Sequence, residues 1–148
     1  GPRGQKASDM DKDFAEDVRA VIARAGFHAV LGYRPVEWSD GLAVLELDLQ
    51  PHHLNLGGVV HGGVLCSLLD VVCAQAGTYT PEPGKIRKAI TLSLTTTFTG
   101  QASQGRIRAI GKLRSRGTRI FNSSGEIFDS EGRLLAMGEG TFRLRSGQ

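Results

Sequence analysis

The stretch from His61 to about Thr78 constrains the fold of this chain more than any other, because nearly every residue in it is Val, Leu, Ala, Cys or Gly. Its length and composition predict a helix that is apolar all round, and such a helix must be buried on most sides. One carboxylate, Asp70, lies inside it. Burial of an unpaired carboxylate is costly, so we expect Asp70 to find hydrogen-bond donors, to bind a proton or to face a wet cavity.

The segments on either side of this helix alternate apolar and polar residues with the period of half-buried β-strands. Before it, we expect strands over about 27–38 and 41–49, joined as a hairpin by Ser39-Asp40-Gly41. After it, we expect a strand from Ile90 and strands over 106–114, 118–128 and 134–144, arranged as an antiparallel meander. The residues expected on one face of the first of these strands are Ile90, Leu92, Leu94 and Phe98, and those expected to bring the last strand close to the helix are Ala136, Gly138 and Gly140.

Two strands, one buried helix and four more strands predict an α+β fold, a six-stranded antiparallel sheet wrapped around one long central helix. The 148 residues, 40% of them hydrophobic, suit a single core. We expect residues 1–8 to be a flexible tail and 9–148 to be one domain. An additional helix is expected to begin at Asp9 or Asp11 and to end at Gly26, with an apolar face made of Phe14, Val18, Val21, Ile22 and Ala25.

Composition narrows the class of protein further. The longest apolar run, from Gly62 to Ala74, is too short to span a membrane, and no signal peptide is visible, so we expect a cytoplasmic protein without a membrane partner. Cys66 and Cys73 lie about 10 Å apart along one helix, which excludes a disulfide between them. A net charge of +3 favours an anionic small ligand over nucleic acid.

Four glycines, Gly57, Gly58, Gly62 and Gly63, surround the start of the central helix. They leave the backbone accessible, so unpaired N–H groups and the positive end of the helix dipole can meet a polar ligand atom. A nucleotide loop is disfavoured, since no Gly-Lys-Ser/Thr follows and no strand directly precedes the glycines. A polarised carbonyl is the favoured ligand. The alternative, that the glycines only permit tight helix–sheet packing, stays open.

The spacing along this helix separates its two polar features. Gly62 and Asp70 are eight residues apart, about 12 Å of helix rise, and His61 and Asp70 lie on roughly opposite sides. If the amide at the start of the helix and the Asp70 carboxylate act on one carbonyl, Asp70 must come from a second subunit, because a base or nucleophile has to approach the reacting atoms within about 3 Å. This predicts a symmetric dimer with two composite sites. Alternatively, Asp70 is a core carboxylate bonded to a neighbouring Thr or backbone N–H.

Asn55, then His61-Gly62-Gly63, then Asp70, followed by a Thr-rich strand, resembles the hotdog-fold acyl-CoA thioesterases of the phenylacetate-pathway type, within the 4-hydroxybenzoyl-CoA thioesterase superfamily. The resemblance covers about 27–145. It implies a helix inside a six-stranded sheet, sheets joined edge to edge in homodimers, and homotetramers. It further implies hydrolysis of acyl-CoA without a metal or redox cofactor, coenzyme A being part of the substrate.

The resemblance also implies roles for single residues. Asp70 would activate a water or attack the thioester, and the Gly62 N–H would hold the thioester oxygen. His61 and Asn55 would orient the thioester, while the Thr91 hydroxyl would help to position the water. We also expect Gly63 and Val64 to contact the substrate, and the size of the acyl pocket to depend on how Val64, Leu68, Phe98 and the opposite subunit pack.

Basic side chains offer contacts for the coenzyme A phosphates. We expect Arg114 and Arg116 to bind them, within a row that also holds Arg106, Arg108, Lys112 and Arg119; Lys85, Arg87 and Lys88 are a second group. The alternative is an ordinary solvated sheet face.

Zinc binding and nucleophilic catalysis by cysteine or serine are less well supported by the sequence. His52, His53 and His61 lack the spacing of zinc ligands, and Cys66 and Ser67 lack a partner His for nucleophilic catalysis. Two alternative functions stay open: a hotdog-fold thioester hydratase or dehydratase, and a non-catalytic acyl-CoA binding module.

Overall fold

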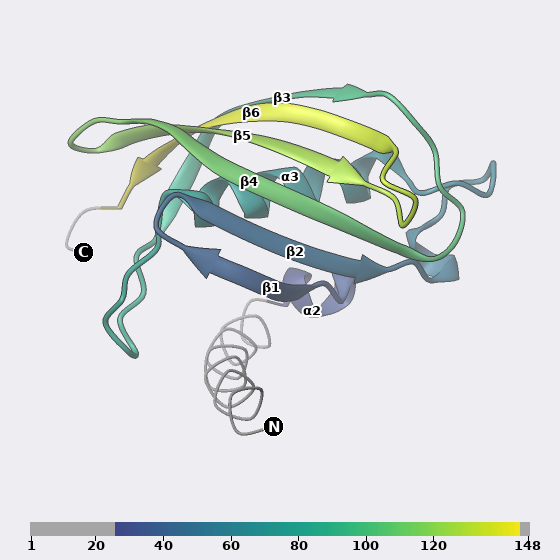
Figure 1. Cartoon of the computed structure of the whole chain (residues 1–148), viewed down its shortest axis with the longest axis horizontal. Coiled ribbons are helices and arrows are strands. Elements are labelled where there is room, and N and C mark those ends of the chain that lie inside the picture. The colour runs from purple at the N-terminus through teal and green to yellow at the C-terminus, as the bar shows by residue number, and fades with distance from the viewer. Residues whose placement is uncertain (1–25, 146–148) are drawn as a thin grey trace.

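A computed structural model describes residues 26–145 of the chain. Figure 1 shows a strongly curved sheet with one helix, α3 (Gly62–Ala76), on its concave side. The sheet is six-stranded and antiparallel, in the order β1-β2-β4-β5-β6-β3. The predicted hotdog architecture is therefore confirmed. The expected tail 1–8 and the expected helix from Asp9 or Asp11 lie outside the described residues.

The segment predicted as the first strand is only partly a strand. Its first residues form the short helix α2 (Phe27–Leu31), and β1 (Arg34–Ser39) begins after it. Glycines with positive φ, Gly26 at +74° and Gly32 at +80°, bracket α2, and the Gly32 N–H donates to the His28 carbonyl at 3.0 Å. These glycine caps outweigh the β propensity of the short apolar run, so the prediction of a strand was wrong here.

The hairpin and the last three strands follow the predicted periods. β2 (Leu42–Asp48) pairs with β1 around the expected turn, and it buries Ala43, Leu45 and Leu47 almost completely. β4 (Arg106–Arg116), β5 (Ile120–Phe128) and β6 (Leu134–Leu144) form a meander. Their inward side chains, including Ile107, Phe121, Ile127 and Phe142, complete the core beneath α3.

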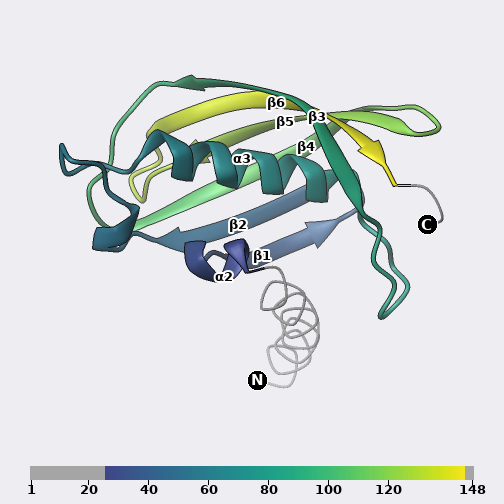
Figure 2. The ribbon, with the colours of Figure 1, turned by 180° about the vertical axis from the view of Figure 1, so that it is seen from behind.

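The strand β3 (Ala89–Phe98) departs from the predicted meander. It pairs with β6 at the far edge, whereas β4 pairs with β2. The connection from β3 to β4 therefore crosses the end of the sheet, as Figures 1 and 2 show. A period of two predicts that a segment is a strand, but it does not specify the neighbouring strand, which depends on how the sheet closes around the helix.

The close approach of helix and sheet uses glycines other than those expected. Gly111 and Gly125 face each other across β4 and β5, directly under α3. A Cβ on Gly111 would collide with the backbone of Val72 and Cys73, and one on Gly125 would lie 2.9 Å from the Leu69 side chain. A Cβ on Gly138 would instead meet the carbonyl oxygen of Thr95 in β3. The sheet can touch the middle of α3 because two neighbouring strands lack side chains there.

The face of α3 turned away from the sheet is not enclosed by the described residues. Figure 2 shows the helix lying uncovered in front of the sheet. The half-buried residues of α3 include Val64, Cys66, Ser67, Asp70 and Val71, while Leu65, Leu68, Leu69 and Val72 are buried. The expectation that the helix is buried on most sides is therefore met only toward the sheet. Within residues 26–145, no helix is long and apolar enough to cross a membrane.

Candidate active site

The carboxylate of Asp70 receives a short hydrogen bond from a neighbouring strand. The Thr91 hydroxyl in β3 donates to Asp70 Oδ1 at 2.6 Å. Asp70 is half-buried on the open face of α3 and Thr91 is exposed, so the pair faces solvent rather than the core. One carboxylate oxygen is positioned by this bond, and the other is available to a water or a ligand.

A β-bulge gives Thr91 its orientation toward the helix. The register of β3 against β6 shifts between Thr91 and Ser93, so Thr91 lies opposite the inward-facing Phe142. Ile90 and Leu92 are about half exposed, at 52% and 54%. The expectation that Ile90 and Leu92 share one face of the strand with Leu94 and Phe98 is therefore wrong, because the extra residue of the bulge reverses the alternation.

The N-terminus of α3 presents a free backbone amide. His61 is the N-cap, and its Nδ1 accepts the Gly63 N–H at 2.8 Å, so a neutral His61 carries its proton on the exposed Nε2. The Val64 and Leu65 N–H groups bond to the His61 carbonyl. The Gly62 N–H has no acceptor among the residues that the structure describes. This amide, at the positive end of the helix dipole, is suited to bind an oxygen that gains negative charge.

The loop before α3 is organised by Asn55. Its Oδ1 accepts the Gly57 N–H at 2.9 Å and the Val59 N–H at 3.2 Å. The predicted role of Asn55 in orienting a thioester would therefore have to use the Nδ2 group, since the side-chain oxygen already holds the loop. Gly63 is exposed beside His61, and Val64 is half-buried against the edge of the core.

The free Gly62 amide and the Asp70 carboxylate of α3 are not brought together within one chain. Helix α3 is continuous from Gly62 to Asp70, so eight residues separate the free amide from the carboxylate by about 12 Å. The predicted separation of Gly62 and Asp70 is thus confirmed. That a second subunit brings another Asp70 close to Gly62 stays a prediction.

Two polar side chains that the sequence did not single out are the half-buried His28, whose Nδ1 is buried, and the buried Tyr33. Their rings lie 5.5 Å apart, and neither His28 Nδ1 nor the Tyr33 hydroxyl has a hydrogen-bond partner in the described part of the chain. Burial lowers the pKa of His28, and the charge of Asp70 opposes this shift. Burial also raises the pKa of Tyr33. His28 was missed because its segment was interpreted as a strand, and no spacing motif connects it to Asp70.

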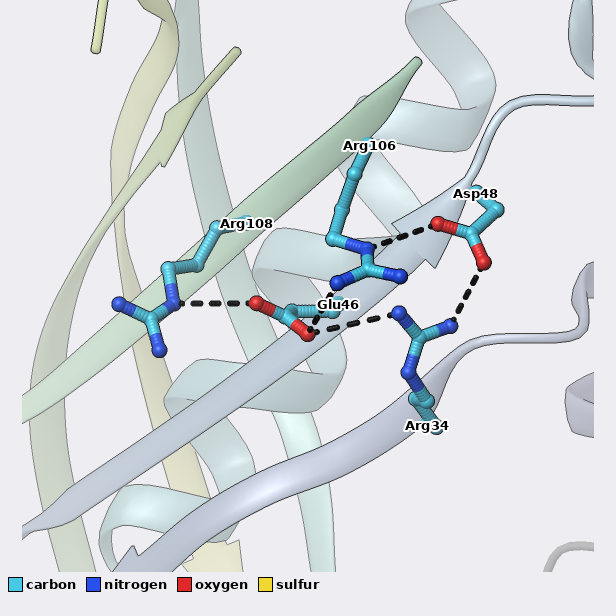
Figure 3. Close-up of polar contacts among 5 residues, drawn as sticks. All are labelled: Arg34, Glu46, Asp48, Arg106 and Arg108. Carbon is cyan, nitrogen blue, oxygen red and sulfur yellow. Dashed lines mark hydrogen bonds and ion pairs between the residues drawn. The ribbon is translucent and has the colours of Figure 1, made fainter. Parts of the chain in front are cut away.

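Basic residues on the outer face of the sheet form an ion-pair network across three strands (Figure 3). Asp48 lies 3.0 Å from Arg34 and 2.9 Å from Arg106, and these two guanidinium groups, Arg106 foremost, hold the pKa of Asp48 below its usual range. Glu46 lies 3.4, 3.8 and 3.5 Å from Arg34, Arg106 and Arg108. The charges of Arg106 and Arg108 are therefore partly compensated within the chain.

The two arginines predicted to bind substrate differ in their surroundings. Arg116 lies 3.4 Å from the exposed Asp40. Within residues 26–145, no acidic side chain pairs with Arg114. Of the two, Arg114 therefore has the charge that no acidic side chain within residues 26–145 compensates.

His53 and Cys73 lie in the interior of the protein. His53 is buried, with Nδ1 accepting the Gln50 N–H at 2.9 Å and Nε2 donating to the Leu31 carbonyl at 2.7 Å. Over residues 26–145, no three His, Cys, Asp or Glu side chains gather as metal ligands would. Cys73 is buried, and this burial, with a smaller contribution from Asp70, raises the pKa of its thiol to about 12.

The chain is similar in sequence and in fold to several known proteins. A sequence profile of the Thioesterase superfamily matches residues 57–136, a range that includes Gly62, Asp70 and Thr91. The chain is 31% identical to a "Putative esterase" of Archaeoglobus fulgidus, over 76% of this chain and 70% of that protein. It is 24% identical to human "Acyl-coenzyme A thioesterase 13", over 93% and 98%. The PaaI protein of the phenylacetic acid degradation operon of E. coli superposes with a TM-score of 0.77 at 20% identity, over 93% and 97%.

Proposed function

Since this chain belongs to the thioesterase superfamily, we propose that it hydrolyses acyl-CoA thioesters to a free acid and coenzyme A. The observation that best supports the proposal is the half-exposed Asp70 carboxylate, held by Thr91 at 2.6 Å on the same helix that begins with a free Gly62 amide. The name of the human relative, an acyl-coenzyme A thioesterase, supports the same substrate class.

The chemistry needs two groups at the thioester carbon. As the oxygen gains negative charge, the Gly62 N–H stabilises it in the transition state. Asp70 acts either as general base, taking a proton from the attacking water, or as nucleophile, forming an anhydride that water then hydrolyses. In both routes the C–S bond breaks and coenzyme A leaves as a thiol. Nε2 of His61 and Nδ2 of Asn55 are the polar atoms left to orient the thioester.

The proposed site requires a homodimer. One chain separates Gly62 from Asp70 by about 12 Å, so Asp70 of one protomer works with Gly62 of its partner. β3 lies at the edge of the sheet, with no described strand on its outer side and with Ile90 and Leu92 half exposed along it. Together with the open face of α3, this edge offers an apolar surface for a second copy, and dimers are proposed to pair further into homotetramers.

Coenzyme A binding is proposed to use Arg114, with Arg116 beside it. Arg114→Glu should raise KM for acyl-CoA and spare an N-acetylcysteamine thioester, which lacks the phosphates. Equal losses on both substrates would remove the arginine from the proposed binding site.

The deciding experiment is Asp70→Asn. We expect the variant to fold and dimerise like the wild type but to lose at least about 10²-fold in kcat, the usual effect of removing an acid–base group. Thiol release from phenylacetyl-, benzoyl-, medium-chain and long-chain acyl-CoA is the measurement. Turnover of Asp70→Asn near that of the wild type would contradict the role of the carboxylate.

The same assay separates the alternative functions. A hydratase or dehydratase would add or remove water at an enoyl or hydroxyacyl thioester without releasing thiol. A binding module would bind acyl-CoA without turnover in the wild type.

A further inference from the structure

The aromatic ring of Phe98 occupies an unusual position on the inner side of the sheet. Phe98 ends β3 and pairs with the fully buried Ala136, so both side chains lie on the inner face. Yet 53% of Phe98 is exposed, and it is not part of the buried core. About half of this large apolar side chain is therefore not used for contacts within the core.

This ring packs against the first residue of α3. A Cβ built on Gly62 would lie 3.3 Å from Cζ and 3.4 Å from Cε1 of Phe98. Such separations are tighter than most real contacts, so any larger residue at position 62 would push the ring away. The Gly62 N–H, the group proposed to bind the thioester oxygen, has no acceptor in the described chain. The half-exposed ring and the residue that carries the free amide are thus neighbours.

A thioester whose oxygen binds this amide places its acyl carbons within reach of the ring. We propose that Phe98 is a specificity-determining residue of the thioester site, forming the apolar wall on which the acyl carbons next to the carbonyl pack. The inference rests on the proposed function, and it names the substrate class: acyl groups with several apolar carbons after the carbonyl are favoured over acetyl. A hydrophobic contact of this kind selects modestly, by about 10- to 200-fold.

The test compares acyl groups of increasing apolar size in wild type and Phe98→Ala. For hexanoyl- and phenylacetyl-CoA, we expect kcat/KM to fall at least about tenfold, while for acetyl-CoA it falls less than about threefold. Phe98→Tyr, which keeps the ring, should retain the wild-type preference. If circular dichroism shows that Phe98→Ala does not fold, Phe98→Leu replaces it. We then expect a smaller fall in kcat/KM, with the substrates affected in the same order.

The matched control is Met137→Ala, which pairs with Thr97 next to Phe98 but lies on the outer face of the sheet with 44% exposure. It should leave the ratio between hexanoyl- and acetyl-CoA unchanged. A loss in Phe98→Ala that is equal for all acyl groups, as dissociation of a dimer would produce, overturns the inference. A wild-type protein that releases no thiol from any acyl-CoA instead contradicts the proposed function itself.

Discussion

The bond between Thr91 and Asp70 permits the sharpest test of the site. Thr91→Val replaces the hydroxyl by a methyl group of similar shape and removes the donor that lies 2.6 Å from Asp70 Oδ1. Hydrogen bonds to charged groups contribute about 1.5–3 kcal/mol. Because Thr91 is exposed and Asp70 only half-buried, the lower value applies. At 1.36 kcal/mol for each factor of ten, kcat should fall about tenfold.

The assay is a double-mutant cycle on thiol release, with Asp70→Ala as the second variant. Once the carboxylate is absent, Thr91→Val should change the residual kcat by less than about twofold, since the hydroxyl then has no acceptor. Thr91→Ser restores a donor and should recover most of the activity. A tenfold loss in both backgrounds would show that Thr91 acts independently of Asp70, and the reasoning from this bond would be refuted.

Three further predictions concern stability. Gly111→Ala should lower the free energy of unfolding in urea by about 2–3 kcal/mol, because its Cβ meets the backbone at Val72. Gly125→Ala should lower it less, because its Cβ meets the side-chain ends of Leu69 and Cys73, which can shift more easily than backbone atoms. His61→Ala should lower it by about 1 kcal/mol through loss of the N-cap, and His61→Asn should preserve the cap. Burial raises the pKa of Cys73 from 9.0 to about 12, so the unfolded chain loses this proton first; stability should fall as pH rises from 9 toward 12, and less steeply in Cys73→Ala.

Local periodicity was sufficient to predict most elements of the fold. The central helix and the later strands follow from the change between a helical period and a period of two, and 134–144 matches the observed β6 in full. The run at Phe27–Leu31 failed, because five apolar or neutral residues suit either a strand or a short helix. The glycines on both sides decide for the helix through their positive φ.

The residues of the candidate site could be named from the sequence, but their geometry could not be predicted from it. The spacing from Gly62 to Asp70 and the family resemblance singled out the carboxylate and its Thr91 neighbour, and the structure brings these two together. That the Gly62 N–H has no acceptor within residues 26–145 depends on the loop before α3, and the neighbourhood of His28 and Asp70 depends on the path of the chain around the helix. Both are long-range properties that no periodic pattern encodes.

A single irregularity, the bulge between Thr91 and Ser93, connects the catalytic proposal with the proposed dimer. Strict alternation would place Ile90 and Leu92 inward and Thr91 outward, away from Asp70. The extra residue turns Thr91 toward the carboxylate and leaves the two apolar side chains half exposed on the edge strand. The same backbone step thus creates the hydrogen bond that positions Asp70 and the apolar edge on which a second subunit would dock. Deletion of Leu92 should leave Thr91 opposite Phe142 and facing Asp70 but take one apolar side chain from the edge. Dimer affinity, measured by sedimentation, should therefore fall, while kcat for thiol release stays near that of the wild type at protein concentrations that keep the dimer. A loss of kcat in a variant that is still dimeric would contradict this account of the bulge.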